Sequence, residues 1–161
     1  MLSTLTPFDT LATQVKYYRA RLAEANPEAR ANPGFGHVDV ARWVYVADSD
    51  AQAKKDSEEG LLRHLKHFFG GQQSGYLGQT SRGEGSVASG LHYDTLARST
   101  IVHGSPATVV SRIEELKAKT GLTSLMLHYP PWYATEKATR SLELFAAEVI
   151  PRLRPPAKAA A

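Results

Sequence analysis

The segment at 37–49, HVDVARWVYVADS, constrains the fold most, because it predicts a strand that is apolar on both faces. Alternation places its side chains on two faces: Val38, Val40, Arg42, Val44 and Val46 on one, and Ala41, Trp43, Tyr45 and Ala47 on the other. A strand covered on both sides is typical of parallel sheets packed between helices. The segment therefore favours an α/β fold.

The rest of the 161-residue chain alternates helices with one more strand. Apolar spacing of three and four predicts helices at 5–25, 51–69, 105–120 and from 135 onward, with a shorter helix after 91. A second strand is predicted at 122–129. Two strands do not make a sheet that helices cover on both faces, and a closed (β/α) barrel needs eight strands. The pattern indicates one domain, 1–161, that is a piece of a larger structure.

Two segments fit neither a helix nor a strand. The stretch at 70–90 is rich in glycine and serine, and a loop of that length in a compact domain is a lid, a binding loop or disordered. We expect a flexible, lid-like loop that includes Gly75 and Tyr76 and extends to Tyr93. The tail at 155–161 is expected to be frayed.

Composition excludes several classes of function. The net charge is +3 without a basic stripe, which argues against nucleic acid as a partner. The absence of cysteine excludes thiolate chemistry, and no apolar run reaches the roughly 18 residues of a membrane span. Without a signal-peptide pattern, we expect a cytoplasmic protein. His64 and His67 are three residues apart but lack a third ligand, so we expect a solvated helix face and no metal site.

Three segments carry a resemblance to a known family: ARWVYVADSDAQA at 41–53, IVHGSPATVVSRIEELKAKTGLTSLMLHYP at 101–130 and ATRSLELFAAEVIPRLR at 138–154. In this order they resemble the C-terminal part of luciferase-like, flavin-dependent monooxygenases, which are TIM barrels. The resemblance implies a partial TIM barrel that contains the last two strands with their helices and lacks the N-terminal strands. GSPATVVSRI and RSLELFAAEVIP are its most specific pieces, and both are packing and capping patterns.

The resemblance also implies a chemistry. The family oxygenates an organic substrate with reduced flavin and O₂, so the implied cofactor is FMN or a deazaflavin, or none in this chain alone. A flavin reductase is an implied partner. No residue here can be named as a base or a nucleophile, because in such enzymes the cofactor carries the difficult step.

His128 is the main candidate for a pocket residue. In the second strand Ser124, Met126 and His128 share one face, and barrel enzymes place their sites at the carboxyl ends of strands. Tyr129 and Trp132 are candidate pocket walls. The alternative is a partly buried histidine bonded to backbone, followed by a rigid turn.

Arg42 is the remaining candidate. A buried guanidinium needs a partner. We expect Arg42 to pair with a carboxylate inside the barrel or to face a ligand.

Two further classes of function stay open. The chain can be a non-catalytic, truncated or split barrel that acts through self-association or through a complementary barrel chain, because an incomplete sheet has exposed edges. It can also be a small-molecule binder without turnover, because a fold does not fix a function.

Overall fold

The computed structural model describes residues 2–4, 6–69 and 92–154. The expected lid residues Gly75 and Tyr76 and the tail at 155–161 lie outside these ranges. The strands are β1 (Leu2–Thr4), β2 (Asp39–Val46), β3 (Val102–Gly104) and β4 (Ser124–His128). The helices are α1 (Phe8–Leu22), α2 (Pro27–Arg30), α3 (Asp50–Phe69), α5 (Tyr93–Ser99), α6 (Pro106–Thr120), α7 (Thr135–Leu144), the π-helical turn η2 (Phe145–Val149) and α8 (Ile150–Leu153).

All strand pairs in the sheet are parallel, and β2 is the strand that the others join. β1 and β4 both pair with the segment of β2 from Asp39 to Ala41, so they lie at opposite edges of β2. β3 pairs further along, with Val44–Val46. The α/β class and the partial barrel are as predicted, and the structure adds β1 and β3 to the two strands that the sequence indicated.

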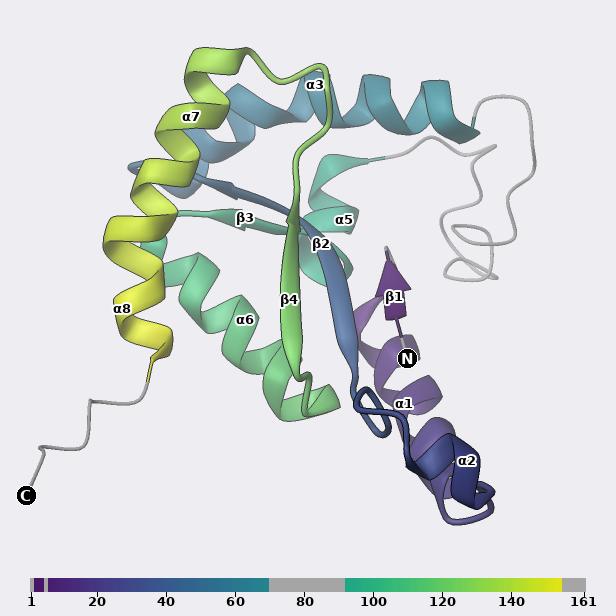
Figure 1. The fold of residues 1–161 in the computed structure, drawn as a ribbon. Helices are drawn as coiled ribbons and strands as arrows, with labels where there is room; N and C mark the ends of the chain where they lie inside the picture. The colour runs from purple at the N-terminus through teal and green to yellow at the C-terminus, as the bar shows by residue number, and fades with distance from the viewer. Residues whose placement is uncertain (1, 5, 70–91, 155–161) are drawn as a thin grey trace, which may run out of the picture.

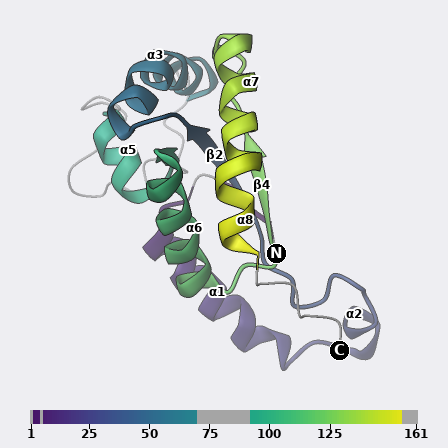
Figure 2. The ribbon, with the colours of Figure 1, turned by 90° about the vertical axis from the view of Figure 1, so that its left-hand side faces the viewer.

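One face of β2 packs against a layer of helices. Alternate β2 valines contact apolar residues of α1, α6 and η2, including Leu11, Ile113 and Val149. Leu125 and Leu127 of β4 pack against the same cluster. Figure 2 shows α1, α6 and the α7–α8 helix in this layer. This cluster is the outer wall of the partial barrel.

The other face of β2 is covered by α3, α5 and the segment after β4. Trp43, Tyr45 and Ala47 pack with α3, α5 and Tyr133 in a second core cluster. α3 crosses the carboxyl ends of β2 and β4 (Figure 1). β2 is therefore buried on both faces, as its sequence predicts.

Capping residues explain where the helices begin and end. Ser105 accepts a hydrogen bond from Thr108 N–H at the start of α6, and Gly121 ends that helix with a φ of 56°. Pro7 and Ala134 occupy the N-cap positions of α1 and α7, without a side-chain capping hydrogen bond. The last helix passes through Pro151. Since Pro151 has no N–H, the helix widens to the π-helical turn η2 just before it and continues to Leu153.

None of the helices in the described ranges combines the length and apolar character required to cross a membrane.

Candidate functional site

Two tryptophans and three histidines gather around the carboxyl end of β4 and the neighbouring part of β2. We refer to Trp43, His64, His67, His128 and Trp132 as the Trp–His cluster. The rings of Trp43 and His128 stack, with centroids 6.2 Å apart and planes 18° apart. His64 contacts both tryptophans, at 5.8 Å from Trp43 and 5.4 Å from Trp132. His67 completes the cluster at 5.2 Å from Trp132.

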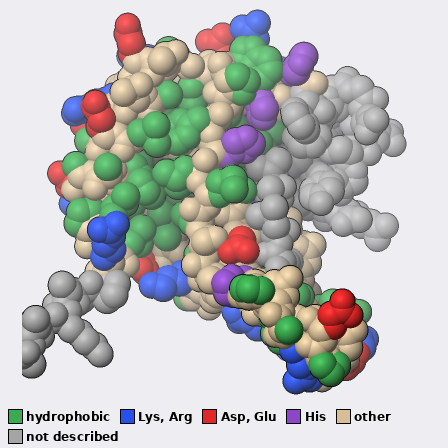
Figure 3. Space-filling view, viewed as in Figure 1, with side chains coloured by type: hydrophobic (Ala, Val, Ile, Leu, Met, Phe, Trp, Pro, Cys, Tyr) green, Lys and Arg blue, Asp and Glu red, His purple; other side chains and the backbone are tan. Residues whose placement is uncertain are grey.

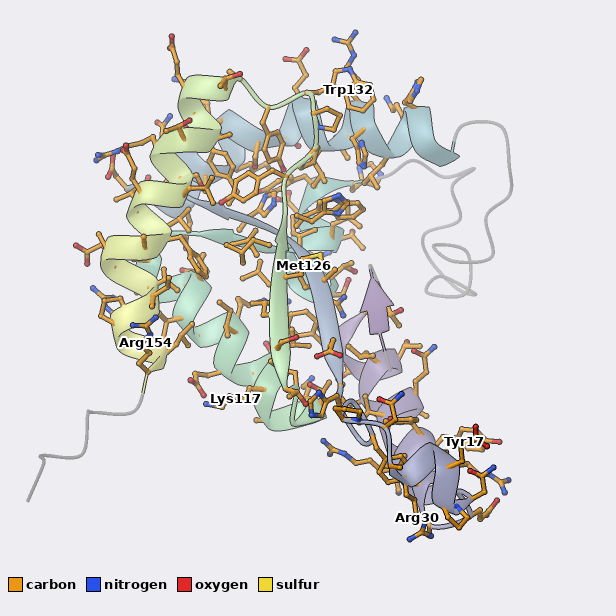
Figure 4. The ribbon with its side chains drawn as sticks, viewed as in Figure 1. Tyr17, Arg30, Lys117, Met126, Trp132 and Arg154 are labelled. Atoms are coloured by element: carbon orange, nitrogen blue, oxygen red, sulfur yellow. The ribbon has the colours of Figure 1, made fainter. Side chains whose placement is uncertain are left out.

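Each ring is held by a different element. His128 is the last residue of β4 and lies in register with Trp43 of β2, which explains their stacking. His64 and His67 are one turn apart on α3. Trp132 follows β4, beside α3 (Figure 4). Gly60 permits this approach, since a Cβ there would lie 2.9 Å from the Trp132 carbonyl oxygen and 2.7 Å from Tyr133 Cδ1.

The electrostatics of the cluster favour a neutral His64 ring. Burial lowers the pKa of His64, and the neighbouring His128 and His67 lower it further. The Arg63 guanidinium lies 5.9 Å from the centroid of the Trp132 ring. Within the ranges that the structure describes, no group of three histidines or carboxylates is arranged to hold a metal ion. The cluster offers flat aromatic surfaces and imidazole N–H groups, which suit a planar ligand with polar edges.

His64 does not lie on a solvated helix face. Its side chain is buried against Trp43, whereas the sequence predicted that α3 would expose it. The sequence gives no signal for this contact, because it depends on how α3 crosses the strand ends.

The predicted pocket residues do not all belong to the cluster. His128 and Trp132 do. Tyr129 points to the opposite side, where it shares a hydrogen bond of 3.1 Å with Ser141 and contacts the ring of Tyr133. Burial raises the pKa of Tyr129.

Arg42 lies among the valines on the outer face of β2, and its partners there are backbone carbonyls. It donates hydrogen bonds to the carbonyl oxygens of Ala41 and Thr6, at 2.8 Å each, and its guanidinium lies near the Phe8 ring. Burial lowers its pKa to about 10. Arg42 therefore ties the segment before α1 to β2, and its partners are backbone carbonyls where a carboxylate or a ligand was expected.

Tyr93 is not a lid residue. It begins α5 and is buried in a hydrogen-bonded group around His103 of β3. His103 Nδ1 lies 3.0 Å from Ser57 Oγ and 3.1 Å from the Tyr93 hydroxyl, and Nε2 lies 3.4 Å from the Tyr133 hydroxyl. Ser57 already donates to the Ala53 carbonyl, so it accepts from an Nδ1–H of a neutral imidazole. Burial lowers the pKa of His103 to about 3.

The start of α6 is occupied by a carboxylate of the chain. Asp50 Oδ1 accepts a hydrogen bond of 2.6 Å from Ser105 N–H, and Oδ2 accepts one of 3.0 Å from the Thr108 hydroxyl. The backbone hydrogen bond from Ser105 lowers the pKa of Asp50. Asp50 therefore fills the position at which a helix start would otherwise bind an anion.

A cleft of about 410 Å³ opens on the other side of the β2 carboxyl end. It lies between the first turns of α3 and α7, and its lining includes Tyr45, Asp48, Asp56, Lys137 and Arg140. Asp56 forms a short ion pair with Lys137, and burial raises the pKa of Tyr45 to about 12. The Trp–His cluster and this cleft are both at the end of the sheet where α/β enzymes bind ligands.

Comparison with solved structures places the fold. One match is the oxygenating constituent of 3,6-diketocamphane monooxygenase from Pseudomonas putida, in complex with FMN. It covers 96% of this chain, with a TM-score of 0.65 and 24% identity. A coenzyme F420-dependent tetrahydromethanopterin reductase from Methanopyrus kandleri matches over 95%, with a TM-score of 0.58 and 20% identity. A long-chain alkane monooxygenase matches over 94%, with a TM-score of 0.57 and 21% identity. The chain has the fold of part of a luciferase-like barrel.

The match covers only part of each solved structure. The chain covers 43%, 45% and 35% of these three proteins. It therefore spans less than half the length of each. No family model and no curated protein matches the sequence.

Proposed function

We propose that this chain forms the C-terminal part of a luciferase-like, flavin-dependent monooxygenase barrel and supplies one wall of its site. The observation that carries the proposal is the position of His128, at the carboxyl end of a parallel strand and on the face that would point into a complete barrel. The fold shared with an FMN-bound oxygenating constituent supports it. The reaction proposed is oxygenation of an organic substrate by reduced flavin and O₂.

The described residues of one chain do not fit a whole flavin. The helix start that would suit a phosphate holds the Asp50 carboxylate, which would repel a second anion. Ser124, Met126 and His128 form one face of β4, the β4 face, which is open to solvent. A planar ring there would have a wall on one side only. We therefore assign no catalytic step to this chain by itself.

In a completed barrel, the role proposed for the Trp–His cluster is positional. His128 and the Trp43 ring would present a flat surface with an imidazole N–H at its edge, and Trp132 would limit the access of water. FMN and a deazaflavin are both consistent with this surface, since proteins of the same fold include an FMN complex and an F420-dependent reductase. The source of reduced flavin would be a separate reductase.

A non-catalytic role is the second candidate. Met126, in the middle of β4, is 61% exposed. An exposed apolar side chain on a strand favours a chain that acts by binding another protein surface over β4. Flavin binding separates the two candidates.

Intrinsic fluorescence provides the test, because both tryptophans of the chain lie in the Trp–His cluster. FMN is titrated against the protein, and flavin absorbance is read across a sizing column. We expect quenching that saturates, weakened at least about tenfold in affinity by His128→Ala and unchanged by Leu142→Ala, a substitution of an exposed residue on α7. Failure of every oligomeric form to bind FMN, F420 or riboflavin would favour the non-catalytic role.

A further inference from the structure

The second half of α3 carries positive charge without negative charge. Positions 60–69 contain Arg63, Lys66 and two histidines, and no aspartate or glutamate, whereas positions 50–59 contain four carboxylates beside two lysines. The helix dipole favours cations near a carboxyl end, which accounts for Lys66 and His67 in the last turn. Arg63 lies before that turn, so the dipole does not account for it. Figure 3 shows histidine side chains gathered in this region, beside the carboxyl end of β4.

Trp132 offers an aromatic surface next to this charge. Its side chain is half-buried, and its ring contacts the rings of His64 and His67 at centroid distances of 5.4 Å and 5.2 Å. The Arg63 guanidinium carbon lies 5.9 Å from the centroid of the same ring. Figure 4 shows Trp132 beside α3. One small molecule can therefore touch the Trp132 ring and the Arg63 guanidinium together.

The charge of Arg63 is available to such a molecule. Among the residues that the structure describes, no carboxylate forms an ion pair with its guanidinium. The separation of 5.9 Å from the Trp132 ring is close to the outer limit of about 6 Å for a cation–π contact, so Trp132 holds the guanidinium weakly. A guanidinium binds a carboxylate through two parallel hydrogen bonds. Arg63 can donate both without giving up an ion pair within the described chain.

We propose that Trp132 and Arg63 bind a small aromatic carboxylate, with the ligand ring on the Trp132 ring and the acid group at Arg63. The acid group is attached directly to the ligand ring, because the two protein groups are only 5.9 Å apart. Flavin does not meet this condition, since the phosphate of FMN is carried on a ribityl chain. As a statement about the substrate of the oxygenation, the inference rests on the proposed function. The binding itself requires no flavin.

Nitrogen-15 NMR of the full chain without added flavin tests the proposal. The chain has two tryptophans, and each gives one indole N–H signal. Trp132→Phe identifies the signal of Trp132. We expect 2-naphthoate to shift this signal until it saturates, with a dissociation constant of about 1 mM. 2-Naphthamide has the same ring without the charge and should bind at least about threefold more weakly.

Three exposed positions on α3 provide the variants. Arg63→Gln should weaken the binding of 2-naphthoate about threefold to tenfold and leave that of 2-naphthamide unchanged. Glu59→Gln should strengthen the binding of 2-naphthoate up to about twofold, because it removes the carboxylate one turn before Arg63. Lys55→Gln is the matched control, since it removes the same charge from the first half of the helix, and it should have little effect. Circular dichroism checks that each variant is folded.

Two results would overturn the proposal. One is equal affinity for the two probes, or wild-type affinity for 2-naphthoate in Arg63→Gln, because Arg63 would then not recognise the acid group. The other is a Trp132 signal that does not move up to about 10 mM 2-naphthoate, ten times the expected dissociation constant. Neither result touches the FMN titration with His128→Ala, so a failure of this inference and a failure of the proposed function are distinguishable.

Discussion

β2 and β4 are neighbouring parallel strands with opposite surroundings. Every β2 residue from Val40 to Val46 is buried, and helices or aromatic side chains cover both of its faces. β4 alternates, with its leucines half-buried and the β4 face exposed. The difference shows that the chain completes its own core around β2, whereas β4 has only the outer half of the packing that a barrel strand receives. The predictions below probe this contrast.

The largest loss of stability is expected when a buried side chain of β2 is truncated. Trp43 is 1% exposed and contacts His64 and His128. We expect Trp43→Ala to lower the free energy of unfolding by about 3–5 kcal/mol. Met126→Ala, measured in urea at a concentration at which the chain is monomeric, should change it by less than about 0.5 kcal/mol. Equal losses for the two variants would contradict the contrast between the strands.

The next effect is a dependence of stability on pH that comes from His103. The folded ring takes up a proton only near pH 3, whereas the unfolded ring takes one up near 6.5. The unfolded state therefore binds more protons between these values, and stability is lost as pH falls through this window. We expect a loss of about 2 kcal/mol between pH 7 and pH 5.

Variants locate this pH dependence. His103→Phe should remove most of the loss between pH 7 and pH 5, although it lowers stability at pH 7. His64→Gln should retain most of the loss. If urea unfolding of the His103 variant still follows the wild-type pH profile, His103 is not the buried neutral group described above.

At Gly60 we expect a smaller change in stability, opposite in sign to the usual effect of replacing a helical glycine by alanine. Replacing glycine by alanine inside a helix ordinarily stabilises it by about 0.5–1 kcal/mol. A Cβ on Gly60 would instead meet Tyr133 and the Trp132 carbonyl, so Gly60→Ala should destabilise the protein by about 1–3 kcal/mol and shift the tryptophan emission. Glu59→Ala, at the exposed neighbouring position, is the control and should have little effect. Stabilisation by Gly60→Ala would show that Trp132 does not rest on α3.

The smallest effect is expected at His128. Its side chain is exposed, stacks on the Trp43 ring and meets the His64 ring edge-on. We expect His128→Ala to cost less than about 1 kcal/mol of stability while changing the Trp43 fluorescence. A loss comparable to that of Trp43→Ala, measured by urea unfolding, would mean that His128 is a core residue and not part of an open site wall.

The long, patterned elements of this fold are predictable from the sequence. The double-sided apolar pattern predicts β2, and Ser105, Pro106 and Gly121 predict the bounds of α6. β1 and β3 are not predicted, because three residues are too short to show a period. The alternation in β4 correctly places its leucines toward the helices and His128 on the other face.

The site is less predictable, because its contacts come from distant segments. His103 lies in a short strand, and its partners Ser57, Tyr93 and Tyr133 come from three separate parts of the chain. The burial of Arg42 follows from the pattern, but its partner is the backbone of Thr6, which no side-chain pattern reports. The stacking of His128 on Trp43 requires the register of β4 against β2.

Amide hydrogen exchange, resolved for single residues, tests the contrast between β2 and β4 most directly. In dilute solution we predict that β2 amides exchange only on global unfolding, because β2 has strand partners at both edges. Every second amide of β4 should exchange rapidly, because half of them face the open edge. Uniform protection of β4 in the monomer would contradict the account, because it would mean that β4 is already completed within a single chain.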